Sequence, residues 1–197
     1  YNEKGDSDEA LKWYNKALKI REQVLDSLSP DLAIVYGNIG MVYHLKRDLD
    51  EALKWYNKAL KIEEQVLNPL SPDLAISYNN IGGVYDYKSD YDEALKWYNK
   101  ALNIFEQVLN PLSPHLATSY NNIGAMFSYK GDYDECLNWY QKALLIQEQI
   151  LDPLSPYLEG SYSNIGKVYL QKGDYDKALE WYNKALKIRE QVLDSLS

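Results

Sequence analysis

The sequence has almost no cysteine, because Cys136 is the only one in 197 residues. A single thiol cannot form a disulfide within the chain, so a small secreted fold held together by disulfides is excluded. A reducing compartment is the simpler expectation. The sequence therefore favours a cytoplasmic protein.

Long apolar runs are also missing. No stretch approaches the roughly 18 consecutive apolar residues that a membrane-spanning helix needs. The opening residues YNEKGDSDEA have neither the positive charge nor the apolar segment of a secretory signal. We therefore expect no membrane association.

Basic residues are the minority among the charges. Lys and Arg number 21 against 29 for Asp and Glu, which gives a net charge of -8. Nucleic-acid phosphates and anionic membranes attract clustered Lys and Arg. The charge thus argues against nucleic acid and predicts a protein or peptide partner that is neutral or basic.

Phenylalanine is scarce, whereas other aromatics are abundant: 2 Phe stand against 19 Tyr and 5 Trp. Tyr and Trp combine an apolar body with a polar tip, so they suit surfaces that are half buried and half wet. We expect many such surfaces.

What the sequence does contain is an internal repeat of 42 residues. The tryptophans mark its period: Trp13, Trp55, Trp97, Trp139 and Trp181. The period divides the chain into a partial copy at 1–28 and complete copies at 29–70, 71–112, 113–154 and 155–197. We expect these copies to form a single array.

Each copy has the pattern of two helices, as the copy at 71–112 illustrates. Ser71 is a suitable N-cap and Pro72 a suitable first residue for the first helix. The apolar residues that follow repeat with a helical period, and the helix is expected to end near Ser89.

The second helix of that copy is expected to open at Asp90. Glu93 follows three residues later, which is the spacing of a capping box. The apolar stripe continues to Asn110, where Pro111 stops it. Because one such pair cannot bury both of its apolar faces, the copies are expected to stack side by side.

The residues that recur match a known pattern. In the first complete copy they are Tyr36-x2-Ile39-Gly40-x2-Tyr43, then Ala52-x3-Tyr56 and Ala59. They resemble the tetratricopeptide repeat pattern, W-x2-L-G-x2-Y followed by A-x3-F. The length of 42 residues, against about 34 for the usual repeat, is similar to repeats of kinesin light chains and of multidomain bacterial signalling proteins.

The resemblance implies a fold and a function. The fold is an all-α solenoid, a right-handed superhelix of antiparallel helix pairs whose first helices line a concave groove. The function is binding of a peptide or partner segment as a scaffold, without catalysis. Small residues are expected where helices approach closely, and Cys136, which replaces an alanine of the pattern, is expected to be a small buried residue rather than a reactive thiol.

The same resemblance places the groove on particular positions of the first helices. The candidate peptide-binding residues are Asn38, Asn79, Asn80, Asn121, Asn122, Asn164, Tyr87, Tyr129 and Lys167. Four of the asparagines occupy one position in every complete copy. An amide can hold a peptide backbone without reading its sequence; alternatively, each asparagine bonds to a neighbouring helix.

The remaining groove candidates differ from copy to copy. Tyr87 and Tyr129 are expected either to stack on ligand side chains or to cover neighbouring helices. Lys167 is the only basic residue at a groove position, so we expect no clamp for a C-terminal carboxylate.

The sequence shows no cluster of residues typical of a catalytic or metal-binding site. His44 and His115 stand far apart, and no Gly-rich phosphate loop or Cys/His cluster occurs. We therefore predict no enzyme, no catalytic residue, no metal and no cofactor. Glu63, Glu64 and Glu148 are expected on a solvated outer face.

Two other functions stay open at this point. The copies are alike and the ends carry no polar cap, so the chain is expected to offer complementary end faces that could stack head to tail as a structural array. It could also be a regulatory arm of a larger signalling protein.

Overall fold

The computed structural model describes residues 3–194, and every regular element in that range is an α-helix. The all-α prediction is confirmed for this part of the chain. The helices are α1 (Glu3–Val24), α2 (Pro30–Leu45), α3 (Leu49–Val66), α4 (Pro72–Tyr87), α5 (Tyr91–Val108), α6 (Pro114–Lys130), α7 (Tyr133–Ile150), α8 (Pro156–Lys172) and α9 (Tyr175–Asp194).

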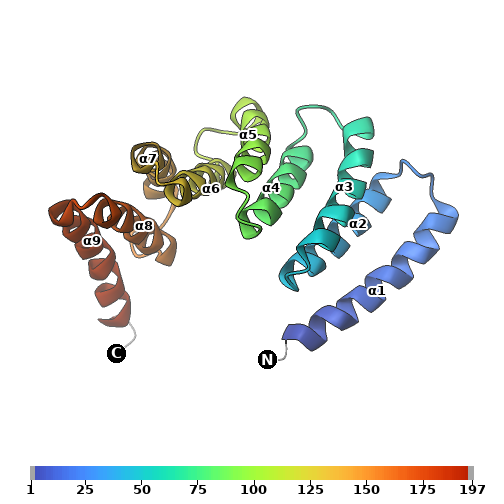
Figure 1. The fold of residues 1–197 in the computed structure, drawn as a ribbon, viewed down its shortest axis with the longest axis horizontal. Helices are drawn as coiled ribbons and strands as arrows, with labels where there is room; N and C mark the ends of the chain where they lie inside the picture. Colours follow the sequence, from blue (N-terminus) through green and yellow to red (C-terminus); the bar gives the residue numbers. More distant parts are fainter. Residues whose placement is uncertain (1–2, 195–197) are drawn as a thin grey trace. The chain divides into compact units, whose positions relative to one another are not determined.

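The helices form two compact units, one up to Val108 and one from Leu109 onward. Unit 1 holds α1 to α5 and unit 2 holds α6 to α9. We call α2, α4, α6 and α8 the A helices, and α3, α5, α7 and α9 the B helices. Each A helix packs antiparallel on the B helix that follows it, and within a unit the pairs stack on one another (Figure 1).

The helix ends follow the predicted chemistry, with one difference. Ser71 accepts a hydrogen bond from the backbone N–H of Asp73 at 3.3 Å, and Asp90 accepts one from the N–H of Glu93 at 3.3 Å. The second half of the capping box is absent, because the N–H of Asp90 donates to the carbonyl of Tyr85 at 2.9 Å. Of the predicted capping box at Asp90 and Glu93, only the hydrogen bond from the Glu93 N–H to the Asp90 side chain forms.

The small residues of the repeat lie where helices meet, as predicted. Ala94 and Cys136 are fully buried. A Cβ atom on Gly40 would lie 2.8 Å from the ring of Tyr56 on the next helix. The equivalent glycines make the same close approach to an aromatic ring: Gly82, Gly124 and Gly166. The close spacing of the two helices in each pair thus depends on having glycine, which has no side chain, at this position.

One tyrosine and one tryptophan form a surface cluster that recurs in each complete repeat. The ring centroids of Tyr78 and Trp97 lie 5.6 Å apart, and the Lys100 ammonium lies 4.1 Å above the Trp97 ring. The Tyr78 hydroxyl donates to Glu64 of the preceding B helix at 3.1 Å. Apolar rings with wet polar tips are what the composition predicted.

Ion pairs also connect successive repeats within a unit. The Lys88 ammonium at the end of α4 lies 2.6 Å from the Asp50 carboxylate near the start of α3. Equivalent pairs join Lys46 to Asp8 and Lys172 to Asp134. These pairs are exposed, so each contributes little to stability, about 0–1 kcal/mol.

None of the helices within residues 3–194 has both the length and the apolar character needed to cross a membrane.

Candidate peptide-binding face

The four recurring asparagines lie at the surface of the A helices. Asn80 and Asn164 are exposed, and Asn38 and Asn122 are half-buried. Within the described residues, none of the four side chains makes a hydrogen bond to a neighbouring helix. By contrast, the exposed amide of Asn99 on α5 donates to the carbonyl of Leu95 at 2.8 Å.

Two further candidate asparagines lie just before Asn80 and Asn122 in the chain. Asn79 and Asn121 are both half-buried, on α4 and α6 respectively. The Oδ1 atom of Asn79 is buried and accepts no hydrogen bond from the described residues. An unpaired buried acceptor costs free energy, so Asn79 is poised to accept a donor.

Tyr87 already has contacts within unit 1. Its ring packs edge to face on His44, with centroids 4.9 Å apart, and the guanidinium carbon of Arg47 lies 3.8 Å from the ring centroid. Burial and the positive charge of Arg47 lower the pKa of His44, so its neutral form is favoured. The tyrosine nevertheless keeps 52% of its surface exposed.

Unit 2 brings three of the predicted residues together. Tyr129 from α6 and Asn164 and Lys167 from α8 line one pocket of about 210 Å³, with Tyr140 of α7 in the wall. The pocket offers an aromatic surface, an amide and an ammonium group. Such a set can accept a short stretch of peptide, with donors for backbone carbonyls and a ring for an apolar side chain.

Cys136 lies within this unit, and its thiol has low reactivity. It is fully buried, and burial raises the pKa of its thiol to about 11. The prediction of a small buried residue is confirmed.

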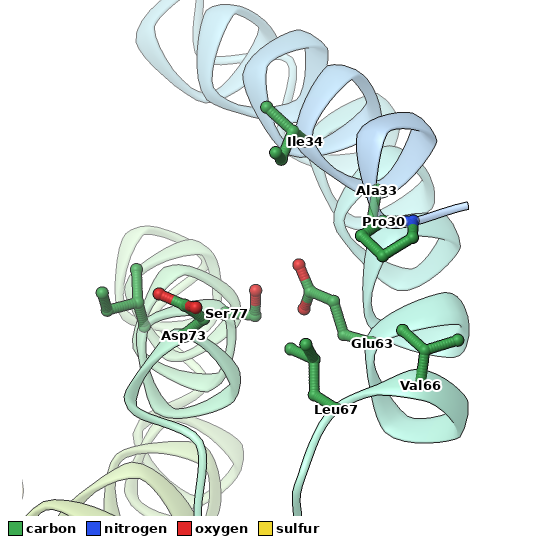
Figure 2. A pocket seen from close by; sticks show the side chains of 9 residues that line it. Pro30, Ala33, Ile34, Glu63, Val66, Leu67, Asp73 and Ser77 are labelled. Atoms are coloured by element: carbon green, nitrogen blue, oxygen red, sulfur yellow. The ribbon is translucent and has the colours of Figure 1, made fainter. Parts of the chain in front are cut away.

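The prediction for Glu63 is wrong, although those for Glu64 and Glu148 are right. Glu64 and Glu148 are exposed, whereas Glu63 is half-buried and lines a pocket between α3 and the A helices α2 and α4 (Figure 2). The residues missed by sequence reasoning are therefore Glu63 and its neighbours Asp73 and Ser77. The only sequence signal for this site was that the residue type at the position of Glu63 changes between copies. The equivalent residues are Arg21, Phe105, Gln147 and Arg189.

Comparison with known families decides which proteins this chain is related to. The tetratricopeptide repeat model matches residues 1–65, 31–107 and 115–191. The chain belongs to the tetratricopeptide repeat family. Repeats of this family generally mediate interactions between proteins. None of the curated proteins compared with the chain matches it.

Solved structures share the tetratricopeptide repeat fold over nearly the whole chain. BtubC (BKLC) from P. vanneervenii is 28% identical with a TM-score of 0.86, and the match covers 96% of this chain and 75% of that one. A putative kinesin light chain repeat protein from P. anserina is 18% identical with a TM-score of 0.82, covering 98% and 91%. MamA is 22% identical with a TM-score of 0.68, covering 97% and 93%. The predicted α-solenoid and its similarity to kinesin light chain repeats are confirmed.

Proposed function

We propose that this tetratricopeptide repeat chain is a non-catalytic scaffold that binds an extended segment of a partner protein on its A helices. The observation that carries the proposal is the pocket of unit 2, where Tyr129, Asn164 and Lys167 meet. They come from two A helices, so a peptide crossing those helices contacts all three.

The recurring asparagines supply the backbone recognition. Within a unit, neighbouring A helices lie roughly 10 Å apart, and an extended peptide advances about 3.3 Å per residue. One asparagine therefore meets about every third residue of the ligand. In the described part of the chain these side chains make no hydrogen bonds to neighbouring helices, which leaves their amide groups available to a ligand. The side chains of Asn80 and Asn164 are also exposed.

The partner segment is neutral or basic and rich in apolar side chains. The net charge of -8 repels acidic ligands. Lys167 provides a single ammonium in the pocket, which suits a backbone carbonyl better than a clamped carboxylate. Each hydrogen bond contributes about 1 kcal/mol net, so we expect a dissociation constant in the micromolar range.

Selection of peptides from a displayed library against the full chain tests the proposal. A selected peptide is labelled, and its affinity is measured by fluorescence polarisation for the wild type and for the variants Asn122→Ala and Asn164→Ala. Each variant is expected to weaken binding about fivefold, which corresponds to about 1 kcal/mol.

The matched control is Asn99→Ala. Asn99 is also exposed but lies on a B helix and bonds only to its own helix. Its replacement is expected to leave the affinity within twofold of the wild type. Equal affinities for all variants, with circular dichroism unchanged, would reject the proposed binding face.

A further inference from the structure

A second pocket lies entirely within unit 1 and uses none of the recurring asparagines. It has a volume of about 300 Å³ and is formed by the N-terminal half of α2, the C-terminal end of α3 and the first turns of α4. Figure 2 shows its lining: Pro30, Ala33, Ile34, Glu63, Val66, Leu67, Asp73 and Ser77. Ile76 completes the wall. We call it the Glu63 pocket.

The pocket combines apolar walls with two carboxylates. In Figure 2 the side chains of Glu63 and Ser77 point toward one another across the cavity, with the Asp73 carboxylate beside Ser77. The Oε2 atom of Glu63 is buried and has no hydrogen-bond partner among the described residues. Neither Glu63 nor Asp73 takes part in an ion pair with another described residue.

This arrangement is unfavourable for Glu63 as it stands. Burial raises the pKa of Glu63, and the negative charges of Asp73 and Glu64 raise it further, while a hydrogen bond from Ser77 opposes the shift. A carboxylate removed from water without a cation carries an uncompensated desolvation cost. A bound cation would remove that cost.

The carboxylate is specific to this junction. At the equivalent position of unit 2 the chain has Gln147, and Ser161 donates a hydrogen bond of 2.6 Å to its Oε1 atom. The serine is thus satisfied by a neutral amide there. Packing of the repeat does not need a charge at this position, so Glu63 calls for a different explanation.

We propose that the Glu63 pocket binds the side chain of a lysine residue from a partner protein. The alkyl chain lies against Ile34, Val66 and Ile76, and the ammonium group lies between the carboxylates of Glu63 and Asp73. The inference rests on the proposed function only in that the lysine belongs to a protein partner. It requires no contact with the recurring asparagines.

Lysine fits better than the other cations. Its compact ammonium has three donors, which match the oxygens of two carboxylates and a serine, and its four-carbon stem suits apolar walls. A calcium ion needs six to eight oxygen ligands, and no group of three or more His, Cys, Asp or Glu residues that could hold a metal occurs in the described part of the chain. The volume is at the lower end for ligand pockets, about 300–1,000 Å³, so it suits one side chain.

The test uses the full chain and Nα-acetyl-lysine amide as the probe. Methyl NMR resonances of Ile34, Val66 and Ile76 are followed during titration. We expect saturable shifts with a millimolar dissociation constant. Nα-acetyl-norleucine amide, which keeps the four-carbon stem but lacks the ammonium, is expected to bind at least tenfold more weakly.

Two variants assign the effect to the carboxylate. Glu63→Gln is expected to weaken lysine binding at least tenfold while keeping the fold, since glutamine occupies the equivalent position on α7. Glu190→Gln, which removes an exposed carboxylate on α9, is expected to change binding by less than twofold. The methyl resonances of Ile150, near Gln147, should not move.

Several results would overturn the inference. They are equal shifts with norleucine amide, unchanged affinity in Glu63→Gln, tighter binding of Nα-acetyl-arginine amide, or shifts caused by calcium chloride but not by lysine amide. Failure of the binding face is distinguishable, because Asn122→Ala and Asn164→Ala should leave binding of the lysine probe intact.

Discussion

A Cβ atom on Gly82 would lie 2.8 Å from the Cδ1 atom of Tyr98, closer than real Cβ atoms pack. Gly82 belongs to α4 and Tyr98 to α5, so the glycine lets the ring sit directly on the helix backbone. Tyr98 is 4% exposed. The A and B helices of this repeat owe their close approach to that contact.

Replacing Gly82 with alanine should therefore destabilise the protein. Overpacking a buried contact costs about 1–3 kcal/mol, and the better helix propensity of alanine returns about 1 kcal/mol. We expect a net loss centred near ~1 kcal/mol, and at most about 2 kcal/mol, in the free energy of unfolding, measured by urea denaturation.

The adjacent glycine provides the control for this experiment. A Cβ on Gly83 would lie 3.5 Å from His44 and 3.7 Å from the Tyr98 hydroxyl, which is ordinary contact. Gly83→Ala should stabilise the protein by about 0.5–1 kcal/mol. Equal effects of the two substitutions would contradict the role given to Gly82.

Replacing Ser89 with glycine should stabilise the protein. It has a φ of 59°, in the left-handed region, where unit 2 has Gly131 and Gly173 with φ of 80°. A residue with a Cβ costs about 1–2 kcal/mol there, and the greater freedom of unfolded glycine offsets part of the gain.

Ser89→Gly is therefore expected to raise the free energy of unfolding by about 0.5–1 kcal/mol, and Gly131→Ser to lower it. Thermal and urea denaturation measure both. A destabilised Ser89→Gly would show that the Ser89 side chain has an unrecognised structural role.

The stability of the unliganded protein should depend on pH through Glu63. Its pKa in the folded state is raised above the ordinary value of 4.5, so the folded state binds the proton more tightly than the unfolded state. This stabilisation is fully present below pH 4.5 and is lost as the pH rises through the folded pKa.

Glu63→Gln removes this dependence. The variant should gain stability relative to the wild type as the pH rises from 4 toward 8, as measured by urea denaturation at several pH values. A difference that is constant over this range would mean that Glu63 titrates normally.

Cys136 should resist thiol reagents in the folded protein. With a pKa of about 11 and a fully buried side chain, its thiolate is scarce at pH 8. We expect its reaction with a disulfide reagent to be at least about a hundredfold slower than in urea. Comparable rates in both conditions would refute the buried environment.

Local chemistry made much of the fold predictable from the sequence. The caps at Ser71 and Asp90 depend on residues next to them in the chain, and the period of 42 residues placed every helix pair. The half-formed capping box was not foreseeable, because the turn geometry directs the N–H of Asp90 to the Tyr85 carbonyl.

The details of the sites depend on which of the variable repeat positions come into contact once the helix pairs stack. Tyr87 and Tyr129 occupy the same repeat position, yet Tyr87 packs on His44 and Tyr129 lines a pocket with Lys167. Glu63 likewise looks solvated on its own helix, and its burial comes from α2 and α4. Sequence periodicity identifies such positions but does not pair them.

Head-to-tail association and a cytoplasmic location stay predictions. Sedimentation velocity at several concentrations measures the former. A sedimentation coefficient that rises with concentration is the expected sign of stacking, and a monomer throughout would remove the structural array as a function.

The binding face itself is tested most directly by the side-chain amides. With a library-selected peptide, the Nδ2 resonances of the two recurring asparagines of unit 2, Asn122 and Asn164, are followed by NMR. We predict saturable shifts of these amides at micromolar peptide, with the Asn99 amide unmoved. Saturable binding that leaves both amides unshifted would contradict the account.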